Sequence, residues 1–209
     1  MTAPVVPVAA DGWRQAGVVM AHAFVDDPVF VAMLPDSGRR PRALLAIMRW
    51  VVRLRRIVGR VDTTPDGRAV AVWRPPGYRE TPAAQLRAAA SVPPILRYCS
   101  VADLRRLASG MSRWERRRNE LMAEPHWVLE GVGVEPSRQR LGLGVVLVRH
   151  GFARADAERV PVMLEANSES NRTLWGKFGF EVIDYTDPAD EPLGVPVWRM
   201  VRQPASSRR

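Results

Sequence analysis

The sequence predicts an α/β protein, because segments with strand patterns and segments with helix patterns alternate along its 209 residues. Two hairpins are expected. The strands of the first are residues 61–63 and 69–73, around Pro65-Asp66-Gly67, and those of the second are residues 181–185 and 195–201. Between the hairpins, a strand, a glycine-containing loop, a helix and another strand follow one another.

The N-terminal third is predicted to hold a strand and two helices. Residues 5–8 form the strand, and Asp11 is in place to cap a helix that continues to about Phe24. The helix ends before Pro28, because the residue that precedes a proline resists helical geometry. A second helix is expected over residues 41–58, where apolar residues recur with helical spacing.

Residues 79–124 carry the weakest pattern, apart from a helix expected over residues 102–122. Its predicted buried stripe consists of Leu104, Leu107, Met111, Trp114 and Leu121. The arginine-rich run 113–118 is interpreted as the salt-bridged outer face of this helix rather than as an RNA-binding segment.

The central unit covers residues 126–180. Strands are predicted over 127–134 and 161–166, and helices over 144–158 and 171–177. Gly142 and Gly144 stand just before the longer helix, where backbone N–H groups and the helix dipole can hold a phosphate. The loop lacks the Lys-Ser/Thr pair of a P-loop and the three spaced glycines of a dinucleotide-binding loop.

Gly131 and Gly133 interrupt a strand that is otherwise rich in valine and leucine. Glycine within a strand often marks a bulge or the close approach of another backbone. We interpret residues 131–134 as a strand edge held open for a ligand whose amide groups pair with it in strand fashion. An extended arm that carries amides and ends in a pyrophosphate fits both strand and loop, and coenzyme A has this shape.

With Gln139, Gly142 and Gly144 in its loop, the segment resembles the acetyl-CoA-binding core of the GNAT superfamily of N-acetyltransferases. Within the superfamily, the chain is similar to the branch of the puromycin N-acetyltransferases and their bacterial relatives. The further matching pieces are Ala23-Phe24, residues 69–73 with Pro75, Gly133-Val134 with Pro136, Leu164-Glu165, Gly179-Phe180, and Trp198 with Met200.

The resemblance implies the acyl-CoA N-acyltransferase fold, an α/β (α+β) fold. Its sheet is mixed and mostly antiparallel, with helices on both faces and splayed central strands. Residues 1–203 are expected to form a single domain, followed by a flexible tail over residues 204–209. The implied activity is transfer of an acetyl group from acetyl-CoA to a primary amine of a small molecule, such as an antibiotic or an aminonucleoside.

The resemblance also implies where the cofactor binds, along the fourth strand, the loop and the start of the short helix. The expected contacts are Val132, Gly133, Val134, Gln139, Arg140, Leu141, Gly142, Leu143, Gly144 and Asn171. The strand backbone would hold the pantetheine arm, and the loop N–H groups the pyrophosphate. For Asn171 the alternative is a plain helix N-cap.

Glu130 and Glu165 are the candidates for the base that takes the proton of the amine, although either can instead be a strand residue paired with an arginine. The family usually has a tyrosine as general acid four residues before the Gly-Phe pair. Trp175 stands there, and its indole N–H donates hydrogen bonds but does not give up its proton. The acid is therefore unassigned, with water, Tyr185 or another tyrosine as substitutes. A backbone N–H near Val132 is the expected oxyanion donor.

Asp26 and Asp27 lie where the related enzymes border the acceptor side of the cleft. We therefore expect them to bind a substrate ammonium group through charge-assisted hydrogen bonds. The alternative is that both are exposed turn residues.

The net charge of +9 comes almost wholly from arginine, and a basic surface favours a polyanion such as coenzyme A. No nucleic-acid-binding motif is recognisable, so no nucleic-acid partner is expected. No apolar run approaches the ~20 residues that span a bilayer, and the first ten residues do not resemble a secretory signal. A cytoplasmic protein without a membrane partner or a metal is expected, and Cys99 is expected to be a small buried side chain. The oligomeric state stays open.

Two other functions stay open. The first is a non-catalytic acyl-CoA-binding sensor that kept the phosphate cradle and lost the acid. The second is a protein N-acetyltransferase that its positive charge draws to acidic or nucleoprotein partners.

Overall fold

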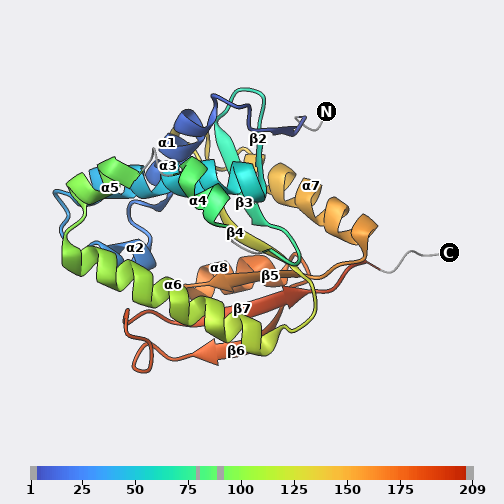
Figure 1. Ribbon diagram of the computed structural model, residues 1–209. Helices are drawn as coiled ribbons and strands as arrows, with labels where there is room; N and C mark the ends of the chain where they lie inside the picture. The colour runs from blue at the N-terminus through green and yellow to red at the C-terminus, as the bar shows by residue number, and fades with distance from the viewer. Residues whose placement is uncertain (1–3, 79–80, 89–91, 206–209) are drawn as a thin grey trace.

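A mixed sheet runs through the parts of the chain that the computed structural model describes, residues 4–78, 81–88 and 92–205 (Figure 1). Within these residues, seven strands pair in the order β1-β2-β3-β4-β5-β7-β6. Their bounds are β1 Val6–Pro7, β2 Arg60–Thr63, β3 Ala69–Arg74, β4 Trp127–Val134, β5 Val162–Ala166, β6 Glu181–Thr186 and β7 Val197–Arg202. Neighbours are antiparallel except for β4 and β5, so the predicted mixed, mostly antiparallel sheet is confirmed.

The parallel strands β4 and β5 separate soon after they begin. Their ladder consists of Trp127 opposite Val162 and Val128 opposite Met163. Beyond these pairs, β4 continues in register with β3, and β5 continues in register with β7. The remaining lengths of the two strands therefore border a gap in the sheet, as expected of splayed central strands.

Helices cover both faces of the sheet (Figure 1). They are α1 Trp13–Phe24, α2 Pro28–Met33, α3 Arg40–Val58, α4 Pro82–Ala88, α5 Val92–Tyr98, α6 Val101–Leu121, α7 Leu143–Glu158 and α8 Glu169–Gly176. Side chains alternate along β3, because successive strand residues point to opposite faces. Val70 and Val72 join the core beneath α1 and α3, whereas Ala71 and Trp73 join the core beneath α7.

A bulge interrupts β4 at Glu130. The ladder with β3 passes from Leu129 directly to Gly131 and has no partner for Glu130. As a consequence Leu129 and Val132, which are three residues apart, both contact the core on the α7 side. Glu130, which follows Leu129, points to the opposite face, where its side chain contacts Arg55 of α3.

Several local predictions differ from the structure. α1 begins at Trp13 with Gly12 as its N-cap and no side-chain cap, so the predicted cap at Asp11 is wrong. Asp27 instead caps α2, a short helix that was not predicted. α4 and α5 were also not predicted, because their seven-residue lengths are too short for a clear apolar period.

The buried face of α6 differs from the predicted stripe. Met111 is 52% exposed, and the buried positions are Asp103, Gly110, Trp114 and Arg118. The predicted stripe is therefore wrong at Met111. The interpretation of Arg118 as part of an exposed outer face is also wrong, because Glu165 of β5 accepts its hydrogen bonds beneath the helix. In Figure 1, α6 is the long green helix that crosses the sheet over β5 and β7.

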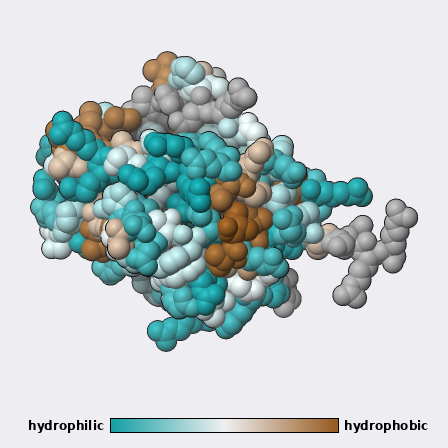
Figure 2. All heavy atoms as spheres, turned by 90° about the horizontal axis from the view of Figure 1, so that it is seen from below, coloured by the Kyte–Doolittle hydropathy of each residue, from teal (hydrophilic) through white to brown (hydrophobic). Residues whose placement is uncertain are grey.

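The β6 strand forms one edge of the sheet, on the lower side in Figure 1. Seen from that side, the surface is largely hydrophilic, with an apolar patch near its centre and smaller apolar spots toward the top and the left (Figure 2). β6 exposes Val182, Ile183 and Tyr185, and its pairing with β7 is irregular between Val182 and Asp184. Among the described residues, no helix is long and apolar enough to cross a membrane.

Candidate active site

The glycine loop after β4 ends at the N-terminus of α7. Gly142 is the N-cap residue and adopts the left-handed conformation with φ of 77°, which glycine allows at no steric cost. Arg140 is also left-handed, with φ of 63°. The first N–H groups of a helix have no partner within it, so those of α7 converge at this loop on the positive end of the dipole.

The loop is joined to the open length of β4. The Gln139 Nε2 atom donates to the Val134 carbonyl at 3.3 Å, which ties the loop to the end of the strand. A Cβ atom on Gly144 would lie 3.5 Å from side-chain carbons of both Val132 and Val134. The gap in the sheet and the start of α7 are therefore adjacent, so one extended ligand can reach both.

The strand glycines have a different explanation from the one expected. A Cβ atom on Gly133 would lie 2.9 Å from the Met20 sulfur and 3.1 Å from the Ala23 side chain, and one on Gly131 would lie 3.1 Å from the Met20 methyl group. The close approach that these glycines permit is that of α1. The strand edge is open because β4 and β5 stop pairing, which no glycine signals.

Glu130 faces the α3 side of the sheet and is held by two arginines. Arg55 Nε donates to one carboxylate oxygen at 2.5 Å, and Arg55 Nη2 donates to the other at 2.9 Å. Arg74 Nε lies 3.8 Å from the same carboxylate. The Arg55 Nη1 atom donates to the Tyr78 hydroxyl at 2.6 Å, and the Tyr78 ring lies 4.7 Å from the guanidinium carbon.

Glu165 is committed to a buried ion pair. Arg118 of α6 donates to its Oε1 from Nε at 3.0 Å and from Nη2 at 2.9 Å, and both side chains are 7% exposed. On the other side of the gap, Arg74 donates to Glu115 of α6 at 3.0 Å. α6 is thus connected to the strands on both sides of the gap.

The acidic turn after α1 lies close to β4. Asp27 accepts from the Val29 backbone N–H at 2.9 Å and so caps α2. Burial raises the pKa of the Asp27 carboxyl, against the hydrogen bonds from the backbone of Val29 and Phe30, which lower it. The Phe24 ring, just before the turn, lies 3.3 Å from the Cβ position of Gly131. Asp26 is exposed on the surface.

α8 begins beside the end of β5. Its N-cap is Ser168, whose hydroxyl accepts from the Asn171 N–H at 3.2 Å, so the plain N-cap role considered for Asn171 is wrong. The Asn171 side chain is exposed one turn into the helix. Trp175 packs on Phe178 and Phe180, with ring centroids 5.9 and 5.8 Å apart.

Tyr185 stands away from the gap. Its strand β6 is separated from β5 by β7, and its ring stacks on Trp198 with centroids 5.1 Å apart. Its hydroxyl donates to Asp187 at 3.4 Å, and about half of its surface is exposed. Tyr78 is instead the tyrosine connected, through Arg55, to Glu130.

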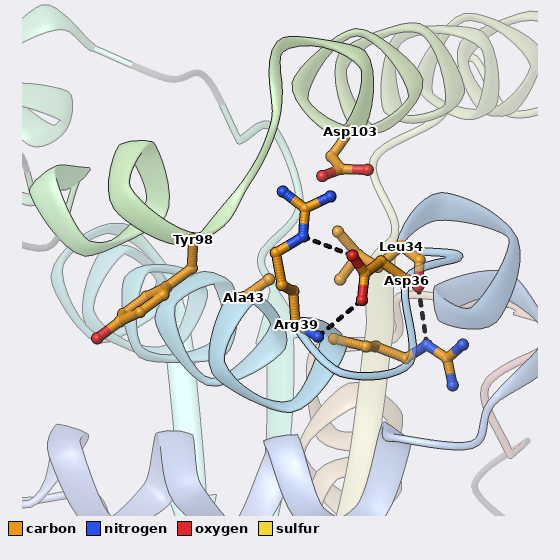
Figure 3. A pocket seen from close by; sticks show the side chains of 7 residues that line it. Leu34, Asp36, Arg39, Ala43, Tyr98 and Asp103 are labelled. Carbon is orange, nitrogen blue, oxygen red and sulfur yellow. Dashed lines mark hydrogen bonds and ion pairs between the residues drawn. The ribbon is translucent and has the colours of Figure 1, made fainter.

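A surface recess at the start of α3 is a structural contact rather than a site. It is lined by Leu34, Asp36, Arg39, Arg40, Ala43, Tyr98 and Asp103 (Figure 3). Asp36 accepts from the Arg39 side chain at 2.7 Å, and Arg40 donates to the Leu34 carbonyl at 2.8 Å, so the polar groups satisfy one another. Among the described residues, no three His, Cys, Asp or Glu side chains are grouped as metal ligands.

Comparison with known proteins identifies a family match over the region that contains β4, the glycine loop and α7. Residues 67–180 match the family model described as "Acetyltransferase (GNAT) family". A Corynebacterium glutamicum structure, described as histone acetyltransferase HPA2 and related acetyltransferase, is 23% identical with a TM-score of 0.69, and all of both chains is covered.

Two further solved structures share the fold at lower identity. A mosquito arylalkylamine N-acetyltransferase like 5b is 15% identical with a TM-score of 0.59, and 96% of this chain and 99% of that chain are covered. The NatC complex bound to Gag peptide and CoA matches with 11% identity, a TM-score of 0.53, and coverage of 97% and 99%. At these identities, the likeness shows the fold alone.

Proposed function

The chain belongs to the acetyltransferase (GNAT) family, and from this premise we propose that it transfers the acetyl group of acetyl-CoA to a primary amine of a small molecule. The observation that carries the proposal is the gap between β4 and β5, which leads directly to the glycine N-terminus of α7. We also propose that residues 1–203 act as one domain, because β1 and β7, near its two ends, belong to one sheet.

We assign cofactor binding to the open strand and the loop. The backbone of Val132, Gly133 and Val134 borders the gap and is suited to pair with the amides of the pantetheine arm. The N–H groups from Arg140 to Gly144, including those of Leu141, Gly142 and Leu143, are suited to the pyrophosphate. Gln139 ties the loop to β4 through its contact with Val134, and we assign Asn171, in the first turn of α8, to a contact with the arm.

The cofactor supplies an acetyl thioester, whose carbonyl carbon is attacked by the neutral amine, so that a C–N bond forms as the C–S bond breaks. We assign the Val132 N–H to the developing oxyanion. Two groups of this chain then matter, the one that takes the proton of the amine and the one that faces the departing sulfur.

Glu130 is the better candidate for the base. Arg55 occupies one lone pair on each carboxylate oxygen, and each oxygen keeps a second one for a proton. Glu130 is also 16% exposed at the bulge, whereas Glu165 is 7% exposed beneath α6. Glu165 is therefore the second candidate, with access to the gap only if Arg118 moves.

The departing thiolate takes up a proton, and Trp175, which stands where the family usually has its general acid, has none to transfer. General acid catalysis contributes typically ~10²–10⁴-fold, but a thiol with a pKa near ~8.5 leaves tolerably without it. We propose that water protonates the sulfur. Tyr185 is a poor substitute, because β7 separates its strand from β5.

Asp26 and Asp27 are proposed to bind the ammonium group of the acceptor before its proton is lost. The position of their turn beside β4 supports this assignment. A small amine is the favoured acceptor because of the resemblance to the puromycin N-acetyltransferase branch, and the arylalkylamine N-acetyltransferase fold neighbours agree with it. A protein acceptor is the alternative, as in the peptide-bound NatC structure.

A thiol-release assay tests the proposal. The protein is incubated with acetyl-CoA and a panel of primary amines that includes puromycin, arylalkylamines and a peptide N-terminus, and coenzyme A affinity is measured by calorimetry. Turnover with a small amine is expected. Turnover with the peptide alone would favour a protein acetyltransferase. Micromolar coenzyme A binding with no turnover would favour the non-catalytic sensor. This is the second candidate function, because Trp175 stands in place of the usual general acid.

A further inference from the structure

A buried arginine stands behind Glu130. Arg55 lies in the last turn of α3 and is 7% exposed. Its Nε and Nη2 atoms donate to the two oxygens of the carboxylate, 75 residues away in the sequence. Such a bidentate contact fixes the carboxylate plane as well as its position.

Glu130 needs an external support, because it is the bulged residue of β4. Its neighbours Leu129 and Gly131 are held by the ladder with β3, whereas Glu130 has no partner in that ladder. Its direction is therefore set by side chains. The Arg74 Nε atom lies 3.8 Å from a Glu130 oxygen, and the same guanidinium also donates to Glu115. Arg55 therefore makes the closer and better-directed contact with Glu130.

Arg55 is in turn held by Tyr78, in the segment that follows β3. The hydroxyl accepts from Nη1 at 2.6 Å, and the ring lies against the guanidinium, with the guanidinium carbon 4.7 Å from its centroid. A hydrogen bond and a ring contact on one guanidinium restrict its rotation. Tyr78, Arg55 and Glu130 therefore form a chain of contacts that ends at the gap in the sheet.

We infer that Arg55 is the positioning residue of Glu130, and that Tyr78 orients Arg55. The inference rests on the proposed function, in which Glu130 takes the proton of the amine. Arg55 occupies the lone pairs that face α3 and leaves the others for the acceptor. Because a displacement of about 1 Å at a reacting group can cost ~10²-fold in rate, this support is expected to appear in kcat.

The test compares Arg55→Ala, Arg55→Lys and Tyr78→Phe with the parent protein on an amine that it acetylates. For Arg55→Ala we expect kcat to fall by about 10²-fold with little change in the KM for acetyl-CoA. Guanidinium ion added at millimolar concentration should restore part of that loss. Arg55→Lys, which keeps the charge but not the two-pronged contact, should fall between the parent and Arg55→Ala, and Tyr78→Phe should lower kcat by less than Arg55→Lys.

Arg202→Ala is the matched control, because Arg202 makes a similar two-pronged contact with Asp156 of α7, at 2.7 and 2.9 Å. It should lower stability and leave kcat unchanged, with no response to guanidinium ion. Where Arg55→Ala does not fold, Arg55→Lys and Tyr78→Phe decide the question, since they remove much less.

Two results would overturn the inference alone. One is a folded Arg55→Ala protein with a kcat within twofold of the parent. The other is a loss of kcat in Arg55→Ala that does not respond to guanidinium ion and that Arg202→Ala, against expectation, shares. A parent protein that binds coenzyme A but acetylates no amine would refute the proposed function instead. A Glu130→Gln protein with full kcat would refute the role of Glu130 on which this inference rests, and would leave acetyl transfer itself in place.

Discussion

Gly151 of α7 lies where the Trp73 ring enters the core. A Cβ atom at this position would be 2.0 Å from the ring carbon Cζ2, far inside contact distance. Trp73 is fully buried, and its ring makes edge contacts with Trp127 and Phe152 at 6.5 and 6.1 Å between centroids. The absence of a side chain at Gly151 therefore lets α7, and the glycine loop that precedes it, pack close to β3.

Gly151→Ala is expected to destabilise the protein by about 1–3 kcal/mol, because the added methyl group must displace a buried ring. Urea unfolding measures the change. Gly176→Ala is the matched control, since nothing lies within 4 Å of its Cβ position and alanine favours the helix. Equal unfolding free energies for the two variants would mean that the Trp73 ring does not pack against α7 as described.

Trp175→Phe is expected to change kcat by well under the ~10²-fold that a lost general acid costs. The phenyl ring keeps the contacts with Phe178 and Phe180, and the indole N–H has no proton to transfer. Trp175→Tyr supplies a phenol and should equal or exceed the parent rate. Steady-state thiol release measures both, and a hundredfold loss in Trp175→Phe would show that the indole N–H takes part in catalysis.

At the scale of the elements, α6 connects the two sides of the gap through Arg118 and Glu115. Arg118→Met leaves the Glu165 carboxylate buried without its partner, so a loss of about 3–5 kcal/mol in unfolding free energy is expected. The double variant Arg118→Met/Glu165→Met should recover most of it. Chemical denaturation measures both, and a single variant as stable as the parent would show that Glu165 is solvated.

The start of α7 offers a second test at this scale. Gly144→Val adds methyl groups toward Val132 and Val134, whose carbons lie 3.5 Å from the Cβ position. We expect the Kd for coenzyme A to rise by about tenfold or more, or ~1.4 kcal/mol, because the added groups narrow the passage from the gap to the loop. Calorimetry measures the affinity. An unchanged Kd would place the cofactor elsewhere.

For the whole molecule, acid stability follows from arginine–carboxylate pairs. Arg202 lowers the pKa of the Asp156 carboxyl through its hydrogen bonds, and Arg117, followed by Arg199, lowers the pKa of Asp184. A lowered folded pKa contributes stability above the unfolded value of about 3.9, and this stability is lost as the pH falls through the folded value. The raised pKa of Asp27 acts in the opposite direction, but it is a single carboxyl, whereas the pKa values of Asp36, Asp66, Asp103 and Glu169 are lowered as well.

The melting temperature is therefore expected to be steady above about pH 5 and to fall below about pH 4. A thermal scan from pH 7 to pH 3 measures it. Asp156→Asn removes one of the titrating pairs, so its melting temperature should depend less on pH in this range. A protein whose melting temperature rose on acidification would contradict the assignment.

Local residue patterns were enough to predict the strands, most of the longer helices and the turns between them. The turn around Gly67, whose φ is 67°, joins β2 to β3 as expected, because a turn depends on residues within four positions. The strand–loop–helix unit around Gly142 was predicted for the same reason. The short helices α2, α4 and α5 were not, since fewer than two helical turns give no apolar period.

The residue pattern alone predicted the order of the strands and of every described helix except α2, α4 and α5, together with the glycine loop at the start of α7 and the membership of the chain in an acetyltransferase family. Which charges meet depends instead on the fold. Arg55 reaches Glu130 across 75 positions, and Arg118 reaches Glu165 across 47. Residue type and spacing do not encode such contacts, because ion-pair partners are chosen by the topology that brings two elements together.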